Sequence, residues 1–450
     1  MTTTASPAAR RGWIEGWDPE NKEFWQQQGN RTARRNLAMS VVAEHVGFSV
    51  WSIWSVLVLF LSPEIGFDFT VGEKFVLVAT PTLVGSVLRL PYSWAVTRFG
   101  GRNWTVLSTA VLLVPASLAW YCVQQPETPL WVFLLIAGLT GLGGGNFASS
   151  TTNIAEFFPQ RHQGWALGLN AGGGNLGVAV VHVVGLLVIA TIGRTNPAVV
   201  AGTYLPLIVL AAVGAACWMD NIDAVRTSAG TLRAAVREPH TWTLSMLYLG
   251  TFGSFIGFSV AFGLVLRNQF DASPLDAAGV TFLGPLLGSL SRPVGGWLAD
   301  RWGGASVTLW TFVGMAGGTG ALLAASTLKS LPTFLVAFTV LFVLTGIGNG
   351  SVYKLIPAVF HNQAHNDGAD TGSLPGAKKL TGSVVGIAGA VGGLGGVVIN
   401  LAFLVSYRET GTGDAAFLSF LVYYAVCLAV TWLLYAQAEP AAVRGEPTRA

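Results

Sequence analysis

Two stretches of the chain decide its fold: RLPYSWAVTRFGG at residues 89–101 and RPVGGWLADRWGG at residues 292–304. They carry Arg, Trp, Arg, an aromatic residue and Gly-Gly at the same places, and the offset between them is 203 residues. Further matches in the same order are GFSV at 47–50 and 257–260, TGLG at 140–143 with TGIG at 345–348, and AGGG at 171–174 with AVGG at 390–393. The chain is therefore built from two related halves.

The composition places both halves in a membrane. Of the 450 residues, 52% are apolar and only 10% are charged, whereas a soluble globular protein carries about 25% charged residues. The net charge of +3 provides no basic surface for a nucleic acid. The three cysteines, each inside an apolar run, lack the spacing of a metal site or a disulfide framework. These figures exclude disordered, disulfide-scaffold and nucleic-acid-binding proteins.

Twelve runs are long and apolar enough to cross the ~30 Å hydrocarbon core as helices. They lie near residues 36–62, 74–97, 104–123, 130–156, 164–191, 197–218, 241–267, 276–299, 306–327, 332–360, 380–407 and 415–436. The longest polar connection falls between the sixth run and the seventh. The sequence therefore predicts an all-α membrane protein with twelve transmembrane helices in two six-helix pseudo-repeats.

The distribution of basic residues predicts the orientation. Of the 25 Lys and Arg residues, 17 lie in segments on the side of the two termini, five in segments on the other side and three within spans. Because Lys and Arg collect in cytoplasmic loops, we expect both termini in the cytoplasm and a multi-pass protein of the cytoplasmic (inner) membrane. The expected organisation is an arm, a six-helix bundle, a linker, a second bundle and a tail, at 1–35, 36–218, 219–240, 241–436 and 437–450.

Duplicated halves with a site at the midplane between them are typical of secondary transporters. Arg89 and Arg292 occupy equivalent places deep within two spans, where a charged side chain costs at least ~2.5–3.5 kcal/mol. One interpretation is that each arginine snorkels or pairs with a buried carboxylate. We favour another, in which both face one cavity and an anion between them relieves their repulsion. The planar donor fork of arginine suits an oxyanion.

Polar and aromatic residues near the span centres are further candidates for the anion site. Asn170 and Asn175 lie in a glycine-rich span, where the glycines indicate close helix packing. Amide groups in hydrocarbon need partners, and these two are suited to donate to a bound oxyanion. The aromatic candidates, which are also suited to ordinary core or lipid contact, are Phe48, Phe147, Tyr248 and Phe252.

Ionisable residues inside spans are candidates for proton coupling. Glu44 and His45 lie in the first span, and Glu44 precedes Phe48 by one helical turn. A protonatable carboxyl beside the pathway is what a proton symporter requires, whereas a structural carboxyl would be protonated or paired with an arginine. Lys354 either adds positive charge to the cavity or pairs with Glu44 or Glu156, and the sequence leaves these alternatives open.

These residues resemble the major facilitator superfamily and, within it, the NarK-type nitrate/nitrite porters. GWLADRWGG at 296–304 is similar to the superfamily's loop motif, whose first-half copy here carries Thr97 in place of Asp. FFP at 157–159, followed by GWALGLNAGGGNLG at 164–177, resembles the first nitrate signature. The segment 382–396 resembles the second, with Gly386 where members often carry Ser. The resemblance covers all twelve spans.

The resemblance implies roles for several residues. Arg89 and Arg292 would be the substrate arginines, Asn175 an amide donor, and Phe147 and Phe252 the aromatic walls of the anion pocket. Phe48 is a looser assignment because the first span matches less clearly. Glu44, Lys354 and the arm around Trp17 to Trp25 look more like the proton-linked branch than the nitrate/nitrite exchange branch.

The expected function is nitrate import by alternating access, with protons as the coupling ion. Nitrate/nitrite exchange and nitrite transport are alternatives within the same fold, and a nitrate sensor or an anion channel are alternatives of other classes. The sequence offers no constellation of catalytic or metal-ligating residues, so we expect neither an enzyme nor a cofactor. The expected partners are nitrate or nitrite, protons and the lipid bilayer. We expect the protein to be a monomer.

Overall fold

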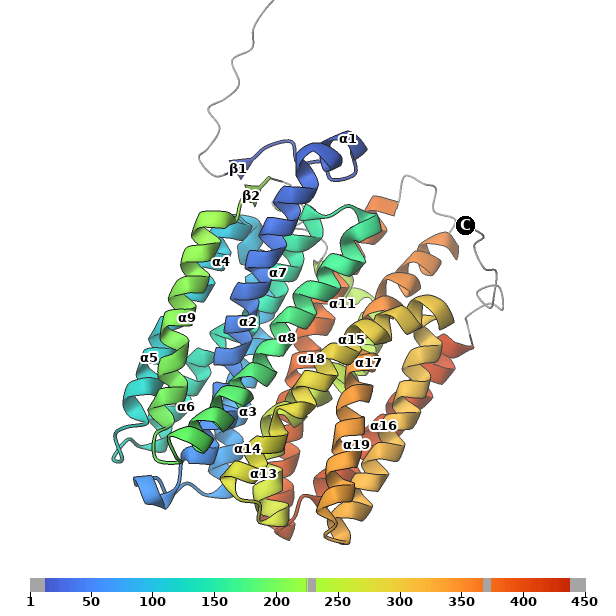
Figure 1. The fold of residues 1–450 in the computed structure, drawn as a ribbon. Coiled ribbons are helices and arrows are strands. Elements are labelled where there is room, and N and C mark those ends of the chain that lie inside the picture. Colours follow the sequence, from blue (N-terminus) through green and yellow to red (C-terminus); the bar gives the residue numbers. More distant parts are fainter. Residues whose placement is uncertain (1–12, 224, 226–231, 367–373, 438–450) are drawn as a thin grey trace, which may run out of the picture.

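Helices account for almost all of the computed structural model, which describes residues 13–223, 225, 232–366 and 374–437 (Figure 1). A helix satisfies its backbone N–H and C=O groups within one segment, which hydrocarbon surroundings demand. Among the described residues there are two strands, β1 (Trp13–Ile14) and β2 (Asn221–Ile222). The outer parts of the expected arm and tail, residues 1–12 and 438–450, and part of the expected linker, residues 226–231, lie outside the described residues.

Each half consists of long helices, several of which are divided at a turn. The first half contains α1 (Lys22–Phe24), η1 (Trp25–Gly29), α2 (Asn30–Phe60), η2 (Pro63–Ile65), α3 (Val71–Phe99), α4 (Gly101–Ala110), α5 (Leu113–Cys122), α6 (Leu130–Thr140), α7 (Leu142–Phe157), α8 (Gln160–Thr191) and α9 (Pro197–Trp218). The second contains α11 (Leu232–Arg237), α12 (Pro239–Tyr248), η3 (Leu249–Gly253), α13 (Ser254–Phe270), α14 (Pro274–Thr281), α15 (Leu283–Trp302), α16 (Gly304–Thr327), α17 (Leu331–Asn366), α18 (Leu374–Thr410), α19 (Asp414–Thr431) and η4 (Trp432–Ala436).

The predicted membrane architecture is confirmed. In the described part of the chain, eleven helical segments are long and apolar enough to cross a membrane. The predicted span at 276–299 consists of α14 and α15, which meet at Phe282, and the spans at 104–123 and 130–156 are likewise divided into two helices each. The eleven do not include α15, which carries Arg292, Asp300 and Arg301.

The duplication read from the sequence is present in the backbone. The arginine-bearing helices α3 and α15 end at equivalent glycines, Gly100 and Gly303, whose φ angles are 88° and 86°. Positive φ is costly for residues with a Cβ, so glycine is the usual residue at such helix ends. The two GG motifs therefore end the helices and start α4 and α16 in the same way.

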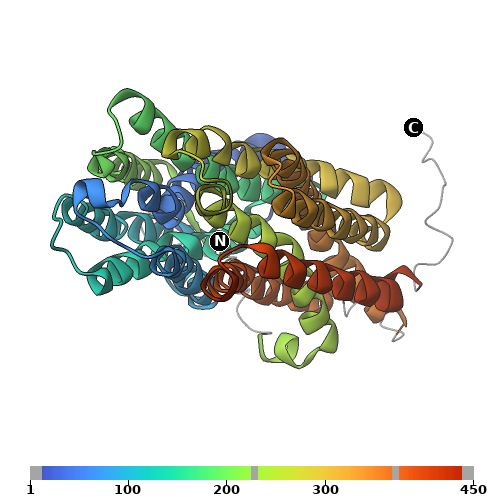
Figure 2. The ribbon, with the colours of Figure 1, turned by 90° about the horizontal axis from the view of Figure 1, so that it is seen from below.

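The halves lie side by side in the view of Figure 2. They meet where α3 packs against α18, α8 against α15, and α2 against α13. Glycines bring α18 close to α3: a Cβ at Gly393 would lie 2.3 Å from Ser86 Oγ, and one at Gly396 would lie 2.8 Å from Thr82 Cγ2. Small residues permit such close approach between membrane helices. The part of α3 just before Arg89 is therefore held against the second half.

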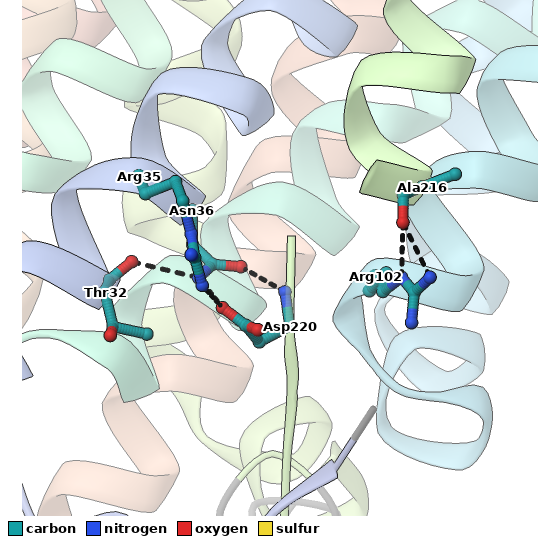
Figure 3. A network of polar contacts seen from close by, with 6 residues as sticks. All are labelled: Thr32, Arg35, Asn36, Arg102, Ala216 and Asp220. Carbon is teal, nitrogen blue, oxygen red and sulfur yellow. Dashed lines mark hydrogen bonds and ion pairs between the residues drawn. The ribbon is translucent and has the colours of Figure 1, made fainter. Parts of the chain in front are cut away.

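Part of the expected arm, residues 1–35, is helical, and its first described residues pair with the linker. Helical structure begins at Lys22, and β1 pairs in parallel with β2, so that Trp13 lies opposite Asn221. Asp220 accepts hydrogen bonds from Asn36 at 2.8 Å and from Arg35 at 2.5 Å, and its N–H donates to the Asn36 side chain (Figure 3). We call this end of the molecule, where α1, β1 and β2 lie together (Figure 1), the arm end.

The two ends of the molecule differ in how closely the halves approach. A Cβ at Gly168 or Gly172 of α8, or at Gly382 or Gly386 of α18, would meet no atom within 4 Å. These glycines lie toward the arm end. At the opposite end, Phe75 of α3 stacks on Phe403 and Tyr407 of α18, with ring centres 5.8 and 5.6 Å apart. These aromatic rings therefore close the contact between α3 and α18 at the end opposite the arm end.

Candidate functional site

Two arginines from equivalent helices lie at one aromatic ring. Arg89 of α3 and Arg292 of α15 are both buried, with 0% and 5% of their surface exposed. Their guanidinium carbons lie over the ring of Phe147 in α7, at 4.8 Å from its centre for Arg89 and 5.8 Å for Arg292. The structure therefore brings the predicted pair together within the membrane-spanning part of the molecule.

Arg89 reaches from the first half into the second. Its Nη1 donates a hydrogen bond to the carbonyl oxygen of Gly389 in α18, and its guanidinium lies 4.7 Å from the ring centre of Phe252 in η3. Trp51 of α2 contributes a third ring, at 5.8 Å. Desolvated cation–π contacts are worth up to about 2 kcal/mol each. The rings therefore offset part of the cost of burying the charge without neutralising it.

Arg292 has its contacts within its own half, apart from Phe147. Its Nη2 donates to the hydroxyl of Tyr248 in α12 at 3.2 Å, and its guanidinium lies 5.0 Å from the ring centre of Tyr353 in α17. A tyrosine hydroxyl is neutral. It orients the guanidinium and leaves the positive charge in place.

Three arginine nitrogens remain open to a further partner. Nε and Nη2 of Arg89 and Nη1 of Arg292 are buried and have no hydrogen-bond partner among the described residues. Nor does a carboxylate of the described residues lie within 4 Å of either guanidinium. Buried charges are normally paired, because desolvation is expensive. Donors of this kind, in the water-poor space between two halves, can bind a small oxyanion.

The predicted aromatic residues form one continuous group around the arginines. Phe147 lies 6.3 Å from Phe48 and 6.2 Å from Phe252, and Phe252 stacks on Tyr248 at 5.2 Å with ring planes only 5° apart. Phe252 belongs to the π-helical turn η3, a type of irregularity that is frequent at functional sites. The ring positions therefore depend on a backbone feature that the sequence pattern did not indicate.

Sequence reasoning missed two residues of this group, Trp51 and Tyr353. Trp51 follows Phe48 by three residues and therefore lies on the same helix face, and its Nε1 donates to the carbonyl of Pro81 at 2.7 Å. Helix periodicity from Phe48 was a signal that could have identified it. Tyr353 had no comparable signal, because its position beside Lys354 does not indicate which way either side chain points.

Glu44 lies in a separate hydrogen-bonded cluster inside the first half. Its Oε2 accepts hydrogen bonds from Ser150 at 2.5 Å and from Asn170 at 2.7 Å. The backbone of Gly174 passes close to it, since a Cβ there would lie 2.5 Å from Oε1. Asn170 is therefore engaged with Glu44 and not with the arginines. The neighbouring His45 points elsewhere, with Nδ1 3.1 Å from the carbonyl of Gly173.

The remaining predicted residues have different surroundings from those expected. Asn175 is fully buried in α8, and neither atom of its amide has a hydrogen-bond partner among the described residues. Lys354 pairs with Asp300 at 2.8 Å and not with Glu44. Asp300 was not expected as a partner, because the predicted span 276–299 ends one residue before it. Gly386 faces open space, so a serine hydroxyl would fit there.

Comparison with known sequences identifies the family. A family model described as "Major Facilitator Superfamily" matches residues 45–400. The chain is 39% identical to the "Nitrate/nitrite transporter NarU" of Salmonella typhimurium, over 95% of this chain and 97% of that protein. The chain belongs to the NarK-type nitrate/nitrite porter family of the major facilitator superfamily. It is therefore an integral membrane transporter, and the resemblance read from its glycine-rich segments is confirmed.

Other members of the superfamily are similar over comparable lengths. The "Probable nitrate/nitrite antiporter NarK2" of Thermus thermophilus is 32% identical, over 96% of this chain and 98% of that protein. Among solved structures, the xylose transporter XylE of E. coli matches with a TM-score of 0.68 at 13% identity, covering 91% of this chain and 100% of that one. At this identity the likeness concerns the major facilitator fold alone.

Proposed function

We propose that this protein imports nitrate across the cytoplasmic membrane by alternating access, with the anion held between Arg89 and Arg292 and with protons as the coupling ion. The observation that carries the proposal is the pair of buried guanidiniums over Phe147, whose open N–H groups have no carboxylate partner among the described residues. The relatives named as nitrate/nitrite transporters support nitrate or nitrite as the oxyanion.

The anion has a physical role in the movement of the halves. Two positive charges in a medium of low dielectric repel one another strongly. A single bound anion with a planar arrangement of oxygens can accept hydrogen bonds from both forks. Binding therefore draws α3 and α15 together, and the halves close around the site only when it is loaded.

The conformation of this structure fits one of the two states of alternating access. With the termini in the cytoplasm, as the distribution of Lys and Arg predicts, the arm end is the cytoplasmic end. The open space beside Gly168 and Gly382 would then face the cytoplasm, and the stacked rings of Phe75, Phe403 and Tyr407 would close the outer side. We assign this structure to the inward-facing state.

Coupling is needed because import of an anion is uphill. An inside-negative potential opposes the entry of one negative charge by ~2.3 kcal/mol per 100 mV. Two protons carried with each nitrate would reverse the sign of the transported charge. Glu44 is the group that we propose takes up a proton, since it is a buried carboxyl whose Oε1 has no hydrogen-bond partner among the described residues.

The test is uptake of nitrate into liposomes that contain the purified protein. We expect saturable accumulation of nitrate when the outside is more acidic, competition by nitrite, and little competition by chloride. Liposomes without protein and liposomes with Glu44→Gln are the controls, and the variant should lose the response to the pH gradient. Uptake that requires internal nitrite and ignores the gradient would contradict proton coupling in favour of exchange. Flux that does not saturate would contradict a carrier.

A further inference from the structure

We propose that a column of buried polar side chains inside the first half carries protons between Glu44 and the arm end, by way of a water molecule held beside the carboxyl. The proposal rests on the proposed function, because it deepens the part assigned to Glu44. Its route is distinct from the path of the anion.

A small polar cavity lies beside Glu44. The centre of a water molecule can move within about 10 Å³ of this cavity. The cavity therefore has room for about one water. The lining residues come from three helices, α2, α4 and α7, and are Ser40, Ala43, Glu44, Thr105, Ser108, Asn146, Ser149 and Ser150. All three helices belong to the first half.

Polar atoms without a partner line this cavity. Oγ of Ser40, Oε1 of Glu44 and both side-chain amide atoms of Asn146 are buried and have no hydrogen-bond partner among the described residues. Unpaired buried groups of this kind cost about 1–3 kcal/mol each, and ordered water is their usual partner. A water in the cavity can accept a hydrogen bond from Asn146 and donate one to the carboxyl of Glu44.

The helix register continues the column toward the arm end. Asn36, Ser40 and Glu44 are spaced four residues apart on α2, so they follow one another along one face. Asn146 and Asn153 of α7 are two turns apart and also share a face. Asn153 is fully buried, and neither atom of its amide has a partner among the described residues.

The column ends at a charged group near the surface. Asn36 donates to Asp220 at 2.8 Å, and Asp220 pairs with Arg35 at 2.5 Å (Figure 3). The side chain of Asp220 is 23% exposed and that of Arg35 is 47% exposed. Asp220 therefore lies where a proton can pass between the column and the solvent at the arm end.

The proton steps balance without a further reactant. Protonated Glu44 gives its carboxyl hydrogen to the cavity water, which passes one of its own hydrogens to the hydroxyl of Ser40, a residue that lines the same cavity. Ser40 releases its original hydrogen toward the arm end, where the carboxylate of Asp220 takes it up and passes it to the solvent, so that the water and the hydroxyl are restored. When Glu44 loses its proton, it becomes a negative charge that attracts the positive guanidiniums of Arg89 and Arg292.

The charged groups that act on Glu44 come from two other helices. Arg89 of α3 and Arg292 of α15 carry positive charge, while α7 and α8 contribute the neutral hydrogen-bond partners Ser150 and Asn170. The lining residues from α4, Thr105 and Ser108, are neutral. Release of the anion from the arginines therefore favours release of the proton from Glu44, which couples the two paths.

The experiment fills the cavity while leaving Glu44 in place. Ser40→Val removes a lining hydroxyl and adds a methyl group, and Ser108→Val does the same from α4. The matched control is Ser52→Val, a buried serine of the same helix α2 that does not line the cavity. Each protein is assayed in liposomes for nitrate uptake driven by a pH gradient and for nitrate–nitrate exchange, in which the proton need not leave the carrier.

A second measurement does not depend on transport. Infrared spectroscopy detects the carboxyl stretching band of protonated Glu44, which is assigned by its loss in Glu44→Gln. We expect Ser40→Val and Ser108→Val to shift this band and to slow gradient-driven uptake by about tenfold or more, because they displace an ordered water whose hydrogen bonds they cannot replace. Exchange should stay close to that of Ser52→Val.

The outcomes separate the two proposals. If wild type responds to the gradient but Ser40→Val and Ser108→Val behave as Ser52→Val does in both measurements, the column is wrong and the function of the site stands. If wild type transports nitrate without any response to the gradient, the proposed coupling fails and the column fails with it. If the variants do not fold, a high-resolution structure of the wild type decides, and a dry cavity overturns the proposal.

Discussion

Arg89 and Arg292 are equivalent in sequence but not in their surroundings. Arg89 bonds to the carbonyl of Gly389 in the opposite half, whereas Arg292 bonds to Tyr248 in its own half. Two fully buried nitrogens of Arg89, and one of Arg292, have no hydrogen-bond partner among the described residues. Duplication has thus conserved the position of the charge, and the two halves hold that charge in different ways.

The difference assigns different tasks to the two arginines. A hydrogen bond that crosses between the halves must break or change if they move apart, so we expect Arg89 to respond to their separation. Arg292 stays with its tyrosine throughout such a movement, because Tyr248 belongs to the same half. The predictions below test this asymmetry.

The largest effect is expected from Arg89→Lys. Lysine keeps the charge but lacks the planar fork, and each hydrogen bond to a charged group is worth about 1.5–3 kcal/mol. We expect nitrate uptake to fall about 100-fold for Arg89→Lys and about 10-fold for Arg292→Lys, measured as initial rates in liposomes. Arg408→Lys, at an exposed position, is the control. Near-normal uptake by Arg89→Lys would refute the two-arginine site, and equal losses would refute the asymmetry.

The next largest effect is expected where α18 packs against the part of α3 just before Arg89. In Gly393→Ala the new Cβ would lie 2.3 Å from Ser86 Oγ, and overpacking of this kind costs about 1–3 kcal/mol. We expect a lower thermal unfolding temperature and slower uptake. Gly386→Ala, which faces open space on the same helix, should match wild type. Equal behaviour of the two variants would show that α18 is not held against α3 as described.

A smaller effect is expected from Tyr248→Phe. This change removes the acceptor of Arg292 Nη2, and a hydrogen bond to a charged group is worth about 1.5–3 kcal/mol. At the lower end of this range, the half-saturating nitrate concentration should rise about tenfold. Tyr353→Phe is the matched control, since the Tyr353 hydroxyl has no partner among the described residues. If the control has the larger effect, Arg292 is oriented by a different tyrosine.

The smallest effect is expected from Gly389→Ala. Arg89 bonds to the backbone carbonyl, which the substitution keeps, and the new Cβ would lie 3.7 Å from Arg89 Nη1 and 3.8 Å from Phe147. These are ordinary contact distances. We expect uptake within about twofold of wild type, since packing changes of this size cost little. A loss as large as that of Arg292→Lys would mean that the space at Gly389 is itself part of the site.

The sequence predicted which residues lie together in the candidate site better than it predicted their partners. Arg89 and Arg292 stood out because charges are rare in spans and because their motifs recur with a constant offset. Asp300, the partner of Lys354, could not be predicted from a single-span pattern, because the contact joins α15 and α17. The pairing of β1 with β2 was equally out of reach, since it joins segments about 200 residues apart whose local pattern is not that of strands.

The order of the fold was predictable and its interruptions were not. Hydropathy located the spans, yet it could not show that the span at 276–299 breaks at Phe282 or that Phe252 lies in a π-helical turn. Such irregularities depend on which neighbouring helix satisfies the freed backbone groups. They are therefore a property of the assembled bundle.

The low apolarity of α15 has a consequence for how the protein is made. A helix that carries Arg292, Asp300 and Arg301 enters a bilayer poorly by itself, because each such residue opposes insertion by up to ~3.5 kcal/mol at the helix centre. Because α16 and α17 pack against it, we expect α15 to enter the bilayer only together with them. Biogenesis of the second half is therefore cooperative.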